Sequence, residues 1–446
     1  MRDAVALQRY LQRHTETGLP AHSFTQPFWH QVLVLPAYRE APALLERLTQ
    51  LPASEGKTLV ILVLNRPDTD FDTQANTDLR NALAQSQLPQ AMRESVPVYC
   101  LNPQADLYLY DMEMRSGPTP SALGVGLARK TGCDLALQWM TAGGISGQWL
   151  CSTDADATLP LDYFAQLDGA QPEAVAAVFP FRHLPGTDEA CDNATALYEL
   201  RLHHYVLGLE YAGSPYAFHT LGSCLAVRAT TYAHVRGFPK RAGAEDFYLL
   251  NKLAKLGPVA RLQGRCIALQ ARRSARVPFG TGPAVAAIMA AKNPREVALF
   301  YHPQCFAALA ALLASLPALA DEPGRDIGLL MAGENGDSAK TCPHFPISPA
   351  LATPAKEALN ELGIASALDH CQRQSKSSAQ FQRHFHQWFD GFRTLKFIHA
   401  LRDAGLPLQP LAELDNLAPQ LWPEATTGRR HGGQLENAIR QHWRWQ

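Results

Sequence analysis

Asp154 and Asp156, two aspartates separated by one residue, are the residues of this sequence whose type and spacing most suggest a site that binds a ligand. They follow an apolar segment, residues 148–151, that is typical of a buried strand. Residues i and i+2 of an extended chain point to the same side, so we expect the two carboxylates to converge where that strand ends. Hard cations such as Mg²⁺ or Mn²⁺ prefer such oxygen ligands and keep positions open for substrate phosphates. An Asp-rich turn before Pro160 is the simpler alternative.

The composition is that of an ordinary globular protein of two or three domains, with 446 residues, 46% of them hydrophobic. Because 40 basic residues balance 41 acidic ones, bulk charge does not favour a nucleic-acid partner. Nine dispersed cysteines without a Cys-x-x-Cys pair indicate a reducing compartment, and we expect a cytoplasmic protein.

The first residues of the sequence contain no continuous apolar segment, so we expect no signal peptide. The longest apolar run, residues 305–320, is interrupted by Ser315 and Pro317 and is short for a bilayer. We interpret it as a buried helix and expect no transmembrane segment, while a peripheral membrane contact stays open.

Strands and helices alternate between residues 30 and 282. The predicted strands are 31–35, 58–64, 96–101, the segment before Asp154, 174–180 and 223–227. The predicted helices are 42–50, 73–87, 121–140, 192–211 and 247–256. This alternation predicts an α/β fold with a mostly parallel sheet and helices on both faces. In such sheets ligands bind beyond the carboxyl ends of the strands.

The sequence predicts three regions. Residues 1–29 form a short helix and a connector, residues 30–282 form the α/β domain, and residues 283–446 form a helical C-terminal region. In the last region, aromatic residues between 381 and 397 recur at helical spacing, and we interpret them as core.

Four segments at predicted strand or helix ends carry a resemblance. They are Leu-Pro-Ala-Tyr-Arg-Glu at 35–40, Asn-Arg-Pro-Asp-Thr-Asp at 65–70, Asp-Ala-Asp at 154–156, and Gly-Ala-Glu-Asp-Phe-Tyr-Leu-Leu at 243–250, which follows Arg-Gly-Phe at 236–238. With Gly-Leu-Ala-Arg-Lys at 126–130, their order resembles family 2-type glycosyltransferases of the GT-A (Rossmann-like) fold. The resemblance covers residues 30–282.

The resemblance implies a nucleotide-diphosphate sugar as donor and an acceptor hydroxyl that the sequence does not identify. It places Asp154 and Asp156 on Mn²⁺ or Mg²⁺, which would neutralise the departing nucleoside diphosphate, with Asp154 also facing the donor. The residues implied to border the base and ribose are Pro36, Ala37, Tyr38, Glu40 and Asn65. An ordinary strand-to-helix loop is the alternative for these positions.

Glu245 and Asp246 begin a predicted helix, where acidic residues also favour the helix dipole. The resemblance assigns catalysis to this pair, with Asp246 as the general base for the acceptor hydroxyl and transfer with inversion.

Arginines supply candidate phosphate contacts. The resemblance places Arg272, Arg273 and Arg276 in a Gly-rich segment that would close over the diphosphate, and a solvated basic loop is the alternative. Arg129 and Lys130 could also reach phosphate, although charges on a helix surface explain them almost as well.

Two positions depart from the family pattern, because Asn65 stands where an acid is usual and Arg236 where a glycine is usual. Two rival functions stay open. A sugar-nucleotide pyrophosphorylase would carry a Gly-rich phosphate loop after the first strand, and residues 35–40 contain no glycine. A catalytically inactive GT-A scaffold would not need Asp154, Asp156 and Asp246.

Overall fold

The computed structural model describes residues 2–273, 280–333 and 347–417. Over the described residues the chain forms two compact units, one from residues 2–192 and 220–286 and the other from residues 193–219 and 287–417. The contacts therefore group residues 2–29 with the α/β region and residues 193–219 with the C-terminal helices. The sequence-based boundaries instead set residues 1–29 apart as a region of their own and included residues 193–219 in the α/β domain.

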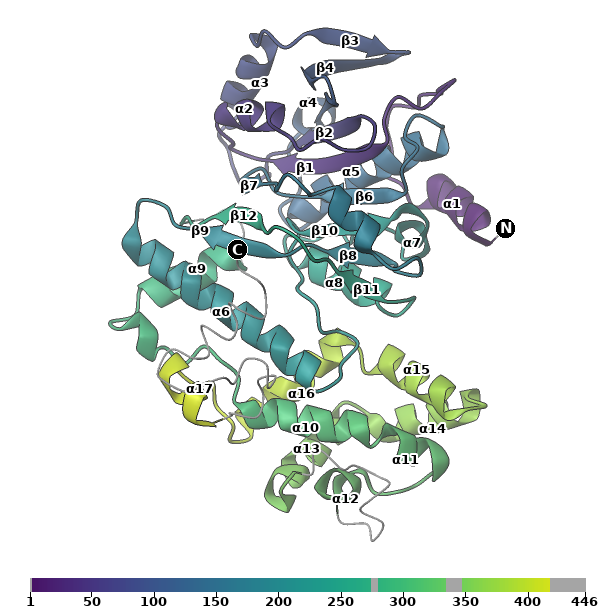
Figure 1. The fold of residues 1–446 in the computed structure, drawn as a ribbon, viewed down its shortest axis with the longest axis vertical. Helices are drawn as coiled ribbons and strands as arrows, with labels where there is room; N and C mark the ends of the chain where they lie inside the picture. Colours follow the sequence, from purple (N-terminus) through teal and green to yellow (C-terminus); the bar gives the residue numbers. More distant parts are fainter. Residues whose placement is uncertain (1, 274–279, 334–346, 418–446) are drawn as a thin grey trace. The chain divides into compact units, whose positions relative to one another are not determined.

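The first unit is built on a nine-stranded sheet (Figure 1). The strand order is β11 (Val259–Arg261), β8 (Ala176–Val178), β10 (Leu225–Arg228), β6 (Trp149–Ser152), β1 (Gln31–Ala37), β2 (Thr58–Leu64), β5 (Ala105–Asp111), β4 (Val96–Asn102), β3 (Gln90–Arg93). The four central strands β6, β1, β2 and β5 are parallel, whereas β10 and β4 run antiparallel to their neighbours. The predicted α/β fold with a parallel central sheet and a helical C-terminal region is confirmed.

Strands β1 and β2 form the centre of this sheet. All of β2 is buried and β1 is buried from its second residue, as their unbroken apolar sequences predict. They pair in register from Gln31 with Thr58 to Ala37 with Leu64, so both end at the same edge. The neighbouring pair of Val34 with Ser152 brings the end of β6 to that edge as well.

Strand β5 was not predicted. It follows β4 directly in a hairpin, and the side chain of Asn102 accepts a hydrogen bond from the Gln104 amide (2.8 Å) in the turn. The first four residues of β5 are all buried, so the strand has no clear alternation that would mark it in the sequence.

The helices of the first unit are α1 (Arg2–Arg13), α2 (Ala43–Thr49), α3 (Thr77–Ala84), α4 (Met112–Ser116), α5 (Gly124–Thr141), the 3₁₀ turn at Ala165–Gly169, α7 (Ala229–His234) and α8 (Glu245–Leu253). Helix α5 packs tightly on β1 and β2, because Gly132 has no side chain. A Cβ atom there would lie 2.4 Å from Val34 and 2.9 Å from Val63. This close packing fixes the helix that carries Arg129 against the central strands.

A second, three-stranded sheet joins distant parts of the same unit. Strand β12 (Ile267–Gln270) pairs antiparallel with β7 (Ala157–Thr158) and parallel with β9 (Phe181–Leu184). The pairing of Leu269 with Ala157 brings the chain that follows β12 next to Asp156.

The second unit is helical. It contains most of α6 (Glu189–Tyr211), the end of α9 (Thr281–Met289) and the 3₁₀ turn at Pro294–Glu296. Its other helices are α10 (Pro303–Ala314), α11 (Leu316–Asp321), α12 (Ile327–Ala332), α13 (Pro349–Glu361), α14 (Ile364–Gln374), α15 (Ser378–Trp388), α16 (Gly391–Asp403) and α17 (Leu411–Leu417). Gly208 of α6 lies against the ring of Phe306 of α10, and a Cβ atom on Gly208 would lie 2.4 Å from that ring. Helix α6 therefore has no side chain of its own at this contact with α10.

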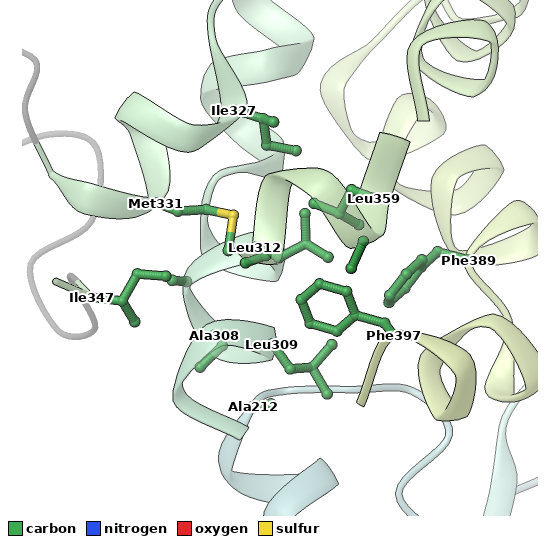
Figure 2. Close-up of a cluster of buried hydrophobic side chains, with 14 of the residues drawn as sticks. Ala212, Ala308, Leu309, Leu312, Ile327, Met331, Ile347, Leu359, Phe389 and Phe397 are labelled. Carbon is green, nitrogen blue, oxygen red and sulfur yellow. The ribbon is translucent and has the colours of Figure 1, made fainter. Parts of the chain in front are cut away.

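Figure 2 shows the apolar core of this second unit, in which Leu309 and Leu312 of α10 lie near Phe389 and Phe397. In the described residues one helical stretch, Pro303–Asp321, is long and apolar enough to span a membrane by length and composition, and two thirds of it is buried inside the protein. The interpretation of this run as a buried helix is confirmed.

The aromatic residues between 381 and 397 belong to two helices, not to one. The side chain of Asp390 caps α16 by accepting a hydrogen bond from the Arg393 amide (3.0 Å), which ends the preceding helix. Phe381 and Phe385 are buried as predicted, whereas Phe392, at the start of α16, is 37% exposed.

Candidate active site

The two aspartates lie on a turn at the end of β6. The Ala157 amide donates to the Asp154 carbonyl oxygen (3.1 Å), so residues 154–157 are not extended, and the expectation of an extended segment was wrong. The side chains of Asp154 and Asp156 are 40% and 28% exposed. Arg47 of α2 donates to the Ala155 carbonyl oxygen and thereby holds the turn.

Arg129 of α5 binds both the aspartate turn and the start of α8. Its Nε donates to Glu245 Oε1 (2.9 Å), its Nη1 donates to Ser152 Oγ (2.8 Å), and its Nη2 donates to Asp154 Oδ1. The side chain is only 3% exposed. The neighbouring carboxylates of Asp154 and Glu245 keep the pKa of this guanidinium above its ordinary value in spite of burial.

Two glycines make room for this arrangement. A Cβ atom on Gly222 would lie 2.4 Å from Nη2 of Arg129, and one on Gly126 would lie 2.5 Å from the Pro239 carbonyl oxygen. The Gly126 amide also donates to the carbonyl oxygen of Arg241 (3.1 Å), which ties α5 to the loop before α8. Gly222 and Ser152 were not predicted from the sequence. The available signals were weak: a Gly-Ser pair before β10 for Gly222, and the polar end of β6 for Ser152.

Asp246 stands in the first turn of α8 beside the buried Glu245. Burial, followed by the charge of Glu245, raises the pKa of Asp246 to about 7. The Phe247 amide donates to its Oδ1 (2.7 Å) and works in the opposite direction. Asp246 therefore has the pKa expected of a proton acceptor at neutral pH.

Asp156 is paired with Arg272, which follows β12. Arg272 Nε donates to Asp156 Oδ2 (2.8 Å). Arg273 turns to a different aspartate, with its Nη2 2.8 Å from Asp188 Oδ2, and it is mostly exposed. Arg276 lies outside the described residues. Of the two arginines in the described residues, the structure brings Arg272 to the aspartate turn and Arg273 to Asp188.

The carboxylates fit a divalent cation by donor type and number. Within the described part of the chain, no group of three or more His, Cys, Asp or Glu residues is placed to hold a metal ion. Mg²⁺ is nevertheless commonly held by one or two carboxylates together with substrate phosphates. Asp154 and Asp156 supply that number, and an arriving cation would compete with the arginines that they bind.

The ends of β1 and β2 hold the residues expected at the nucleotide. Tyr38 donates to Asp70 Oδ2 (2.5 Å), and Arg39 adds two hydrogen bonds to the same carboxylate (both 2.9 Å). These contacts hold the pKa of Asp70 well below its ordinary value, with Arg39 making the largest contribution. The Asn65 amide donates to the carbonyl oxygen of Ala37 (3.1 Å), so the two strand ends are joined.

The remaining predicted nucleotide contacts lie on the same strand and loop. Pro36 and Ala37 are buried within β1, Glu40 is half-buried in the loop that follows, and Asn65 is nearly buried. Asn76 fastens the two loops to each other, since its side chain accepts from the Arg39 amide (3.0 Å) and donates to the Asn65 carbonyl oxygen (3.0 Å). The structure therefore brings these residues to the sheet edge that carries the aspartate turn.

Lys130 does not reach this edge. It is 5% exposed, and its Nζ donates to Asp134 Oδ2 (2.7 Å), to Tyr10 Oη (2.7 Å) and to the His14 carbonyl oxygen (2.8 Å). Both sequence-based interpretations of Lys130, as a phosphate contact and as a helix-surface charge, were wrong. It faces α1, whose packing the sequence did not reveal.

No family model and no curated protein matches this sequence. The structure is similar to residues 1–349 of S. aureus TarS in complex with UDP-GlcNAc, with a TM-score of 0.38 and 11% identity over 77% of this chain and 92% of that one. It is also similar to the mannosyltransferase PcManGT from Pyrobaculum calidifontis in complex with GDP-Man and Mn²⁺, with a TM-score of 0.34 and 17% identity over 86% and 95% of the two chains. Similarities at this level do not assign the chain to a family.

Proposed function

We propose that this protein is a metal-dependent glycosyltransferase that moves a sugar from a nucleotide-diphosphate donor to an acceptor hydroxyl with inversion. One observation carries the proposal: Arg129 joins Asp154, on the turn after β6, to Glu245, whose neighbour is Asp246. One carboxylate of the proposed cation site and the residue next to the candidate base thus bind the same guanidinium, at the sheet edge where ligands of α/β proteins bind.

The donor would be held by the ends of the central strands. In this proposal Tyr38 and Asn65 border the base and ribose, and Asp154 and Asp156 hold Mn²⁺ or Mg²⁺. When bound, such a cation neutralises the charge of a departing nucleoside diphosphate. Arg272 already lies at Asp156 and would offer its guanidinium to the diphosphate.

Asp246 would accept the proton of the acceptor hydroxyl. The acceptor oxygen then bonds to the anomeric carbon while the bond from that carbon to the phosphate oxygen breaks, and the anomeric configuration inverts. Because the pKa of Asp246 is raised to about 7, this carboxylate is a stronger base than an ordinary aspartate and is still partly ionised at neutral pH.

Thermal unfolding in the presence of UDP- and GDP-sugars, with and without Mn²⁺, tests this proposal. A specific donor stabilises the native state by mass action, by about 2.7 kcal/mol at a hundred times its Kd. We expect one class of nucleotide sugar to raise Tm strongly with Mn²⁺ and weakly in EDTA. If no nucleotide sugar raises Tm with any metal, the proposed donor is wrong.

A further inference from the structure

The guanidinium of Arg129 is where three distant segments of the first unit meet. Ser152 and Asp154 belong to the end of β6, Gly222 lies on the segment before β10, and Glu245 begins α8. The three segments lie within about a hundred residues of one another along the chain. Strand pairing joins two of them here, because β10 pairs with β6. Arg129 adds the link from the end of β6 to the start of α8.

The guanidinium of Arg129 is largely occupied by contacts within the protein. Each of its three nitrogens donates a hydrogen bond within the protein, and the side chain is 3% exposed. A Cβ atom on Gly222 would lie 2.4 Å from Nη2, so a larger residue there would displace the guanidinium. This differs from the sequence-based prediction, which placed Arg129 among the residues that bind the nucleotide sugar.

The start of α8 has a strained backbone. Its N-cap residue, Ala244, makes no side-chain capping hydrogen bond and has a left-handed backbone with φ of 57°. Such a conformation is costly for alanine and persists only where the surroundings enforce it. The bond from Arg129 to Glu245 and the bond from Gly126 to the Arg241 carbonyl oxygen are two contacts that do so.

We propose that Arg129 is a positioning residue: it fixes the aspartate turn and the first turn of α8 relative to each other and does not bind donor or acceptor itself. The proposal rests on the proposed function, in which that turn holds the cation and Asp246 is the base. A planar, rigid guanidinium suits this task because it can donate in three directions at once, which an ammonium group cannot do in the same geometry.

The substitution Arg129→Lys tests the proposal because it keeps the positive charge and loses the fork of donors. Two backbone amides report on the two turns in the free protein. The Ala157 amide donates to Asp154 O and the Tyr248 amide donates to Ala244 O, both at 3.1 Å. We expect hydrogen exchange to accelerate at both amides in this variant. Because no substrate is present, this result does not depend on whether the proposed function is correct.

Kinetics then separate positioning from binding. Misplacement of a reacting group by about 1 Å costs on the order of a hundredfold in rate. We expect kcat for nucleoside diphosphate release to fall to that extent in Arg129→Lys, with KM for the donor close to wild type. The double variant Lys130→Met/Asp134→Asn is the matched control, since it removes the neighbouring buried ion pair, and it should leave both amides and kcat unchanged.

Glu245→Gln provides a second variant should Arg129→Lys fail to fold. It is nearly isosteric and weakens only the bond to α8, so exchange should rise at Tyr248 but not at Ala157. The proposal is overturned if Arg129→Lys changes exchange at neither amide, or if its kinetic loss lies in donor KM alone. An inactive wild-type protein would instead contradict the proposed function and leave the exchange result standing.

Discussion

Two neighbouring residues of α5, Arg129 and Lys130, sit at the centres of two buried clusters that have similar chemistry and different surroundings. Both are cations with less than 6% of their surface exposed, and both donate to a carboxylate. Asp134, the partner of Lys130, is completely buried. Asp154, a partner of Arg129, is 40% exposed.

The Lys130 cluster is closed on every side. Asp134 accepts hydrogen bonds from Lys130, from the hydroxyls of Tyr10 (2.5 Å) and Tyr232 (3.0 Å), and from the Glu16 amide (2.9 Å). These contacts fasten α1 and the chain after it to α5 and α7. A carboxylate so fully used has nothing to offer a ligand, so this cluster is structural.

The Arg129 cluster differs because it opens onto solvent at one end. In the proposed function, the half-exposed Asp154 can still bind a cation and the neighbouring Asp246 can still accept a proton. Of these two clusters, the Arg129 cluster has an accessible carboxylate and the Lys130 cluster does not. Changes to the Arg129 cluster should therefore alter activity first, and changes to the Lys130 cluster should alter stability first.

Asp246→Asn should have the largest effect on activity. The amide is nearly isosteric with the carboxyl but cannot accept a proton, and loss of a general base typically slows a reaction by about a hundred- to ten-thousand-fold. Rates of nucleoside diphosphate release at saturating donor measure this loss. Donor affinity should be kept, and a fall of less than tenfold would place the base elsewhere.

Lys130→Met should have the largest effect on stability. It leaves the buried Asp134 without its cation, and breaking one partner of a buried pair costs about 3–5 kcal/mol in the free energy of unfolding. Urea denaturation measures that cost. Adding Asp134→Asn should restore part of the loss, because no buried charge is then left uncompensated. A fall in kcat of the folded double variant would show that this cluster is more than structural.

The pH dependence of Asp246 sharpens the contrast. Its pKa of about 7 lies above the ordinary value near 4, so activity that needs the ionised base should rise with pH through about 7. Its contribution to stability has the opposite sign. It is fully present below about pH 4 and is lost as pH rises through about 7. Stability curves of wild type and Asp246→Asn should therefore converge below about pH 4, separate between about pH 4 and 7, and keep a constant difference above that; curves that stay parallel from about pH 4 to 7 would show an ordinary pKa.

Arg236→Gly should have the smallest effect. Arg236 ends α7 with a left-handed backbone, φ of 66°, and its amide donates to the Ala233 carbonyl oxygen (3.2 Å), an arrangement that usually contains glycine. The neighbouring Gly237 lies against Tyr10 and Tyr232 of the Lys130 cluster. We expect a gain of about 0.5–1 kcal/mol in the free energy of unfolding, after the entropic cost of glycine, and unchanged activity. A loss of stability would mean that the arginine side chain is needed there.

The sequence was sufficient for the strands at the centre of the sheet. Strands β1 and β2 are continuous apolar segments, as burial on both faces requires. The predicted range of β2 agrees with the structure, whereas β1 continues two residues beyond its predicted end, through Pro36 to Ala37. Strand β5 and the three-stranded sheet were missed. Short strands such as β7, with two residues, are defined by their partners and not by a local pattern.

The sequence predicted which residues belong to the candidate site, but not which of them contact one another. Asp154, Asp156 and Asp246 stand near strand and helix ends as expected, whereas the turn at 154–157 and the role of Arg129 depend on residues far away in the chain. Arg129 and Lys130 illustrate the limit, since adjacent positions on a helix face different neighbours. Only the packing of α1 and α8 distinguishes them.

Nucleoside diphosphate release from a nucleotide sugar, measured with Mn²⁺ and in EDTA for wild type and Asp156→Ala, tests the central claim most directly. The account predicts release by the wild type only when metal is present. It predicts loss of that activity in Asp156→Ala with an intact fold, because the half-exposed side chain contributes a ligand and little core volume. Equal release in EDTA, or wild-type activity of Asp156→Ala at low Mn²⁺, would contradict a metal-dependent donor site at the aspartate turn.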